Sequence, residues 1–94
     1  MVEIKDYKKV PVVIKAVQFT ETSTLMTQAL VQLGMKLEEV VYNYSADDGL
    51  PYIFIETLEG RMVCKLNDWI LKGIKGELYP CKDEIFKGTY EEVR

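Results

Sequence analysis

The stretch that decides the fold is ETLEGRMVCKLNDWILKGIKGELYPCKDEIF, residues 56–86 of a 94-residue chain. Short runs of β-branched and aromatic residues alternate in it with Gly, Asn and Asp, which favour turns. The extended runs are Arg61–Leu66, Trp69–Lys72 and Glu77–Cys81. Gly60 is free to adopt positive φ in the hairpin turn that precedes them. We predict a tight antiparallel unit, closed by one helical turn at Lys82–Phe86 in which Asp83 caps the helix and Gly88 ends it.

Two further strands are expected on the N-terminal side of this stretch. Tyr52–Leu58, YIFIETL, leads directly into the hairpin, and Val10–Phe19, VPVVIKAVQF, opens the fold. Both faces of Val10–Phe19 are largely apolar, so this strand is predicted to be central or covered on both sides. Pro11 lacks an N–H and fits the beginning of the strand better than its middle.

A helix is predicted between these strands. Thr20–Ser23 offers several N-cap residues, and apolar residues then recur at three- and four-residue spacing up to Leu33. Gly34 stands where a helix commonly ends in a left-handed residue. Lys36–Tyr44, KLEEVVYNY, is predicted as a strand after the helix, followed by a loop at Ser45–Gly49.

Length and pattern together predict one domain spanning residues 1–94. The expected fold class is α+β. It consists of a bent antiparallel sheet of five or six strands, which curls as a meander toward a half-barrel, with one main helix at about residues 23–33 and a short C-terminal helical turn.

Composition argues against several classes of function. The chain has no His, which excludes Ser-His-Asp and Cys-His nucleophile systems, and it shows no glycine-rich phosphate-binding motif. We expect no enzyme activity, and no catalytic, cofactor-binding or metal-binding residues. Charged residues at the N-terminus and the lack of a long apolar run predict a cytoplasmic protein without a membrane partner. Cys64 and Cys81 are then expected to be free thiols.

The segment DWILKGIKGELYPCKDEIFKGTYEEV, residues 68–93, resembles a family of small bacteriophage and prophage proteins of unknown function. Members of that family read close to PGDWIIKGVKGEFYPCKPDIFEKTYE, often after a strand like PVVIKAVQF and a TLEG sequence. Leu66 and Asn67 stand here in place of the family's Pro-Gly; because Asn tolerates left-handed φ, the turn is expected to persist. The resemblance implies a phage or prophage origin in a bacterial host, and it implies no reaction.

One candidate interaction surface emerges from these residues. It combines basic and aromatic side chains in the family-like segment, namely Trp69, Lys72, Lys75, Tyr79 and Lys82. Such a set is able to hold a nucleic-acid backbone and stack a base, although the net charge of −3 disfavours that function. The alternative is that the lysines form a solvated sheet edge and that Trp69 packs in the core.

Three functions therefore remain open. The first is a phage- or prophage-encoded accessory protein that is non-enzymatic and binds a host or phage protein, through a sheet edge or as a homo-oligomer. The second is a small nucleic-acid-binding module that uses Lys72, Lys75 and Trp69. The third is a small-ligand-binding domain in the curl of the sheet. Elimination of the other two favours the first.

Overall fold

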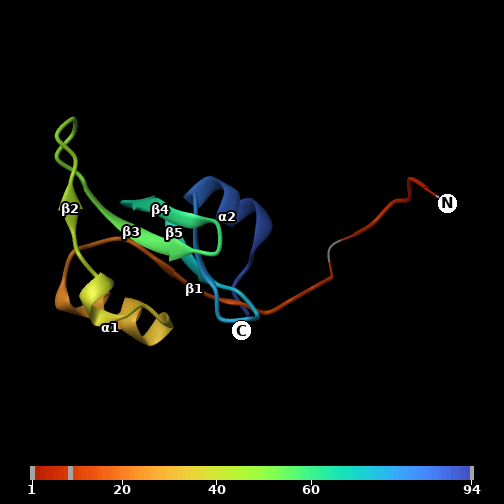
Figure 1. Ribbon diagram of the computed structural model, residues 1–94, viewed down its shortest axis with the longest axis horizontal. Coiled ribbons are helices and arrows are strands. Elements are labelled where there is room, and N and C mark those ends of the chain that lie inside the picture. Colours follow the sequence, from red (N-terminus) through yellow and green to blue (C-terminus); the bar gives the residue numbers. More distant parts are fainter. Residues whose placement is uncertain (1, 9, 94) are drawn as a thin grey trace.

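The computed structural model describes residues 2–8 and 10–93 and confirms the α+β class, with two α-helices and two three-stranded antiparallel sheets (Figure 1). One sheet has the order β1-β5-β6 and the other β2-β3-β4. The strands are β1 (Lys15–Gln18), β2 (Asn43–Tyr44), β3 (Pro51–Thr57), β4 (Gly60–Lys65), β5 (Trp69–Lys72) and β6 (Leu78–Cys81). The helices are α1 (Thr24–Leu33), the 3₁₀ turn η1 (Leu37–Glu39) and α2 (Asp83–Thr89).

The prediction of a single sheet of five or six strands is wrong. The expected meander breaks between β4 and β5, where Asn67 takes a left-handed conformation with φ 74°. The Asn67 N–H donates to the Phe19 carbonyl at 2.7 Å, and the Phe19 N–H donates to the Asp68 carbonyl at 2.9 Å. These bonds tie the chain after β4 to the end of β1. As a result β5 pairs with β1, not with β4, and begins a second sheet. The described strands do not close into a barrel.

The first predicted strand is shorter than expected, and its position differs. Pairing with β5 covers only Lys15–Gln18, and β1 is an edge strand of its sheet, not a central one. The preceding residues are extended and mostly exposed. They continue into an arm, residues 2–8 and 10–14, that reaches away from the body of the molecule (Figure 1).

Helix α1 confirms the predicted helix. The Ser23 side chain caps it by accepting the Met26 N–H at 3.2 Å, and Gly34 ends it at φ 140°. Met26, Leu30 and Leu33 form its buried face. After the helix, the predicted strand at Lys36–Tyr44 is wrong in most of its length, because η1 occupies its beginning and only the last two residues pair with β3.

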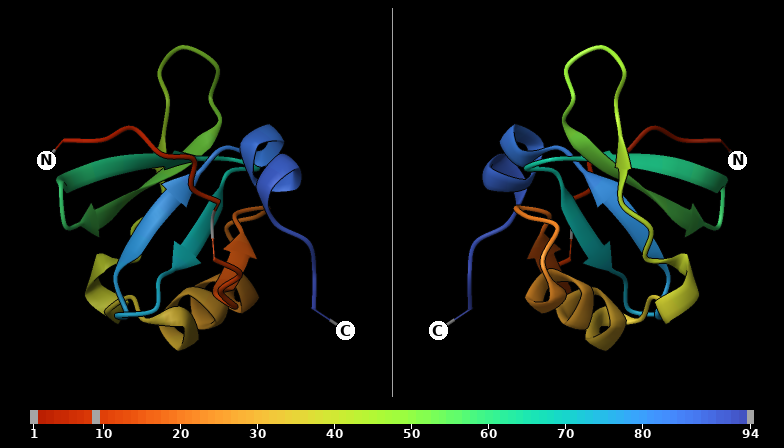
Figure 2. Two further views of the ribbon diagram at one scale, coloured as in Figure 1. Left: turned by 90° about the vertical axis from the view of Figure 1, so that its right-hand side faces the viewer. Right: turned by 90° about the vertical axis from the view of Figure 1, so that its left-hand side faces the viewer.

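The core lies between the two sheets and α1. Its fully buried members are Phe19, Leu30, Ile53, Ile55, Cys64 and Ile70. Sheet alternation places Val17, Ile70 and Leu78 on the core-facing side of the β1-β5-β6 sheet. Figure 2 shows α1 at the end of this sheet that holds the β5–β6 turn, and α2 near its other end. The opposite face of the sheet, which carries Trp69, is therefore left for α2 and the C-terminal tail.

Candidate functional site

The face of the β1-β5-β6 sheet opposite the core carries an aromatic stack. The ring of Trp69, on β5, lies 3.8 Å from that of Phe86, on α2, with 12° between the ring planes. The Phe86 ring in turn stacks on Tyr90, with centroids 5.1 Å apart. A stacked aromatic pair stabilises a fold by more than the burial of its apolar area alone. The stack thus fixes the short helix α2, whose seven residues are too few to be stable alone.

Asp83 links the stack to its surroundings. Its Oδ1 accepts the Trp69 indole N–H at 2.9 Å, and its Oδ2 forms an ion pair with Lys87 at 3.0 Å. The bond from Trp69, and then the bond from Lys87, lower the pKa of the Asp83 carboxyl below its usual value. The prediction that Asp83 caps the helix is wrong: Lys82 is the N-cap residue, and the helix continues through Gly88 to Thr89. The Asp83 carboxylate is used to hold Trp69.

The five residues of the candidate interaction surface do not come together. Trp69 and Tyr79 lie on the face opposite the core, while alternation along β5 places Lys72 on the other face. Lys75 is exposed in the turn between β5 and β6, and Lys82 is exposed at the far end of β6. The Trp69 ring is already stacked on Phe86. A shared basic and aromatic surface for nucleic acid stays a prediction without geometric support.

The environments of the two cysteines and of Tyr79 raise the pKa values of their side chains. Cys64 is fully buried, and burial, followed by the nearby Asp68 charge, raises the pKa of its thiol to about 12. Burial and Asp68 also raise the pKa of the half-buried Cys81 thiol. Burial, and then a hydrogen bond with Tyr90, raise the pKa of Tyr79 to about 12. Thiolate is the reactive form of Cys, so these environments make both cysteines poor nucleophiles.

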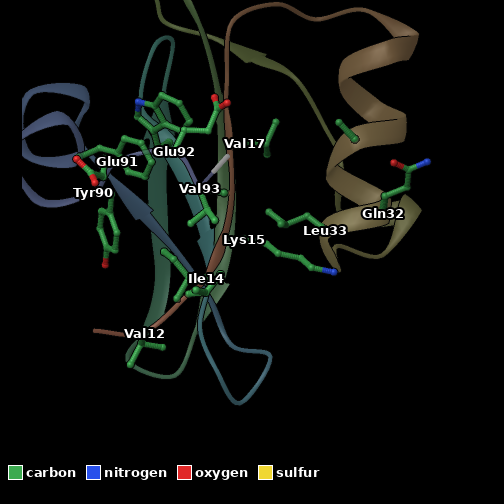
Figure 3. Close-up of a pocket in the computed structure, with 15 residues that line it drawn as sticks. Val12, Ile14, Lys15, Val17, Gln32, Leu33, Tyr90, Glu91, Glu92 and Val93 are labelled. Carbon is green, nitrogen blue, oxygen red and sulfur yellow. The ribbon is translucent and has the colours of Figure 1, made fainter. Parts of the chain in front are cut away.

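A groove of about 640 Å³ runs beside β1, and sequence reasoning did not find it. Gln32 and Leu33 of α1 lie on one side of β1, and Tyr90 and Val93 of the C-terminal tail lie on the other (Figure 3). Apolar side chains dominate the lining, which comprises Val12, Val13, Ile14, Lys15, Ala16, Val17, Ala29, Gln32, Leu33, Trp69, Phe86, Tyr90, Glu91, Glu92 and Val93. The aromatic stack is thus one end of a larger concave surface.

The open edge of β1 faces this groove. The backbone groups of Phe19 point toward the chain before β5, as its two hydrogen bonds show. Backbone direction alternates along a strand, so Val17 and Lys15 also point toward β5, whereas Ala16 and Gln18 point outward. In the part of the chain that the structure describes, β1 has no strand on this outer side. An unpaired edge of this kind is a template for another strand.

Exposed apolar side chains gather in the chain that enters β1. Val10, Val12 and Val13 are 73%, 46% and 76% exposed, and Val2, Ile4 and Tyr7 of the arm are also exposed. Contiguous exposed apolar surface in a folded chain commonly marks an interaction site. The signal available in the sequence was the apolar character of both faces of Val10–Phe19, which predicted a strand that is central or covered on both sides.

Comparisons with known proteins do not assign this chain. No family model, curated protein or solved structure matches it. Within residues 2–8 and 10–93, no three Cys, Asp or Glu side chains gather in a way that would hold a metal ion. Neither described helix has the length and apolar content needed to cross a bilayer.

Proposed function

We propose that this chain is a non-enzymatic binding module, encoded by a phage or prophage, that acts by associating with another protein chain in the bacterial cytoplasm. The observation that carries this proposal is the open edge of β1, which faces an apolar groove and continues into exposed valines. Addition of a strand to a free sheet edge is a common mode of protein recognition: backbone hydrogen bonds supply affinity and alternate side chains supply specificity. The phage origin rests on the resemblance of residues 68–93.

A capture experiment with matched variants tests this function. The tagged protein serves as bait in extracts of phage-infected bacteria that also express an untagged copy. We expect a specific chain, either another protein or the untagged copy, to be retained. Val12→Asp should abolish retention, because it places a charge in the apolar groove.

Val41→Asp is the control for this experiment. Val41 is 54% exposed, lies outside the strands and does not line the groove. Retention that is equal for both variants, or no retained chain at all, would contradict the proposal.

Binding of a small apolar ligand is the second candidate, because the groove volume falls within the range of about 300–1,000 Å³ that ligand sites occupy. Trp69 is the sole tryptophan and lines the groove, so its fluorescence reports entry. A saturable change in Trp69 emission with an anilinonaphthalene dye, lost in Val12→Asp and kept in Val41→Asp, would favour this candidate. A flat titration would remove it.

A further inference from the structure

The described part of the chain before β1 belongs to neither sheet. Val10–Phe19 has the composition of a strand that is central or covered on both faces, yet β1 pairs only over Lys15–Gln18. The preceding residues run outward into the arm (Figure 1), and their valines are exposed. Exposure of three valines in one short segment costs solvation free energy that a pairing partner would recover. One additional strand would both pair with the open edge of β1 and cover the exposed valines.

We propose that the missing strand is the same segment of a second copy of this chain: Val10–Gln18 of two copies pair antiparallel about a two-fold axis at Ile14. This inference deepens the proposed function, on which it rests, by naming the occupant of the groove. A two-fold interface uses one patch on both subunits. Here one continuous segment supplies both the strand that enters and the edge that receives it.

The backbone directions fit this arrangement. In the proposed dimer the strand conformation of β1 continues back to Val10, and alternation from Ala16 and Gln18 would then point the backbone groups of Ile14, Val12 and Val10 toward the open edge as well. Pro11 falls on the opposite parity, so the N–H that it lacks would have faced the β5 side. The one proline of the segment therefore leaves every outward hydrogen bond intact.

The side chains fit as well. With the axis at Ile14, Val12 lies opposite Ala16 of the second copy, and Val10 lies opposite Gln18. Paired residues share a face of the sheet, so these side chains fall on the face of Trp69, and Val12 and Ala16 are among the residues that line the groove. The small side chain of Ala16 leaves room for Val12. The two β1-β5-β6 sheets would join into one sheet of six strands, in which β1 becomes central, one of the two arrangements that its apolar composition predicts.

The proposed contact consists of residues 10–18 and the groove walls from α1, α2 and the tail. These are fewer than the roughly 20–30 residues a side of a standard interface, so the proposal also requires residues 2–8 of the arm to pack on the second copy. The arm points away from its own body and is free to reach a neighbour (Figure 1).

Two proline variants of adjacent valines separate this pairing from other modes of association. Val12→Pro removes an N–H that points to the open edge, and Val13→Pro removes one that points the other way. Both positions lie outside β1 and are exposed, so both variants should fold like the unmodified chain. Sedimentation equilibrium over a range of concentrations gives the dissociation constant of each.

We expect the unmodified chain and Val13→Pro to show twice the 10.9 kDa mass of the chain, and Val12→Pro to weaken the dimer at least about tenfold, since each dimer carries the change twice. Val10→Pro, one outward position further from β1, should also weaken it and serves if Val12→Pro unfolds. Equal dissociation constants for Val12→Pro and Val13→Pro would overturn the pairing. So would an unmodified chain that is monomeric at all concentrations, while capture of a different protein in the experiment above would still support the proposed function.

Discussion

Two apolar segments of this molecule differ in what their side chains contact. From Trp69 to Tyr90, the aromatic rings stack, Leu71 is buried and the Asp83 carboxylate binds Trp69 and Lys87. In residues 2–8 and 10–13, the described part of the N-terminal chain, the apolar side chains are exposed and no residue pairs in a sheet. The first segment serves the fold. The second is the part of the molecule whose contacts are incomplete, so we infer that binding takes place there.

The largest difference between the two segments should appear on truncation of a buried and an exposed side chain. Leu71→Ala leaves a cavity at a residue that is 1% exposed, and we expect it to lower the free energy of unfolding by about 2–5 kcal/mol. Ile4→Ala, at a fully exposed residue of the arm, should change it by no more than about 0.5 kcal/mol. Urea denaturation measures both. Similar losses would mean that the arm packs on the body of the same molecule.

The next largest loss of stability is expected at the turn that separates the two sheets. Asn67 has φ 74°, a conformation that costs most L-residues about 1–2 kcal/mol. Asn67→Ala should lower stability by about that amount, whereas Asn67→Gly should cost no more than a few tenths of a kcal/mol, because Gly adopts positive φ readily. Denaturation midpoints compare the two variants. Equal losses would show that the left-handed turn does not limit the fold.

A smaller loss of stability is expected when the hydrogen bond between Trp69 and Asp83 is removed. Trp69→Phe keeps a ring for stacking on Phe86 but removes the indole N–H, so the thermal midpoint should fall. In an Asp83→Asn background the same replacement should have a smaller effect, because the charge-assisted bond is already weakened. Additive effects of the two replacements would contradict the coupling.

The smallest expected effect is a pH dependence of the stability that the Asp83 carboxylate contributes. The pKa of Asp83 is lower in the folded than in the unfolded chain, so its contribution to stability is present above the ordinary Asp pKa of about 3.9. That contribution is lost as pH falls through the lowered folded value. The stability advantage of the unmodified chain over Asp83→Asn should therefore be constant near neutral pH and shrink below about pH 4. Thermal melts across this range would reveal a pH-independent difference if the carboxylate were not involved.

Local features of the fold were predictable from the sequence. Ser23 and Gly34 mark the two ends of α1, and Gly60, with φ 107°, forms the turn of the β3–β4 hairpin. The pairing of β5 with β1 was not predictable by the same means, because it joins segments about 50 residues apart and depends on bonds between Phe19 and the chain around Asn67.

The candidate site was predicted less well. Trp69 and Lys72 are close in sequence but face opposite sides of β5, and the Trp69 ring is held by Phe86 of the following helix. The groove unites side chains from β1, α1, α2 and the tail, which no local pattern reveals. The apolar faces of Val10–Phe19 did carry a relevant signal, since they predicted a strand that is central or covered on both faces, and in the single chain β1 is an edge strand.

The central claim, that two copies meet at Ile14, is tested most directly by cross-linking in a Cys81→Ser background, which leaves the buried Cys64 as the remaining native thiol. In the proposed register, residue 14 of one copy lies opposite residue 14 of the other, at about 5.5 Å between Cα atoms, within disulfide reach. Residue 10 lies opposite residue 18, far from its own counterpart. Under mild oxidation, Ile14→Cys should form a disulfide-linked dimer quickly and Val10→Cys slowly. Val10 is the more exposed of the two, so cross-linking that is as fast or faster at residue 10 would follow random collision and contradict the account.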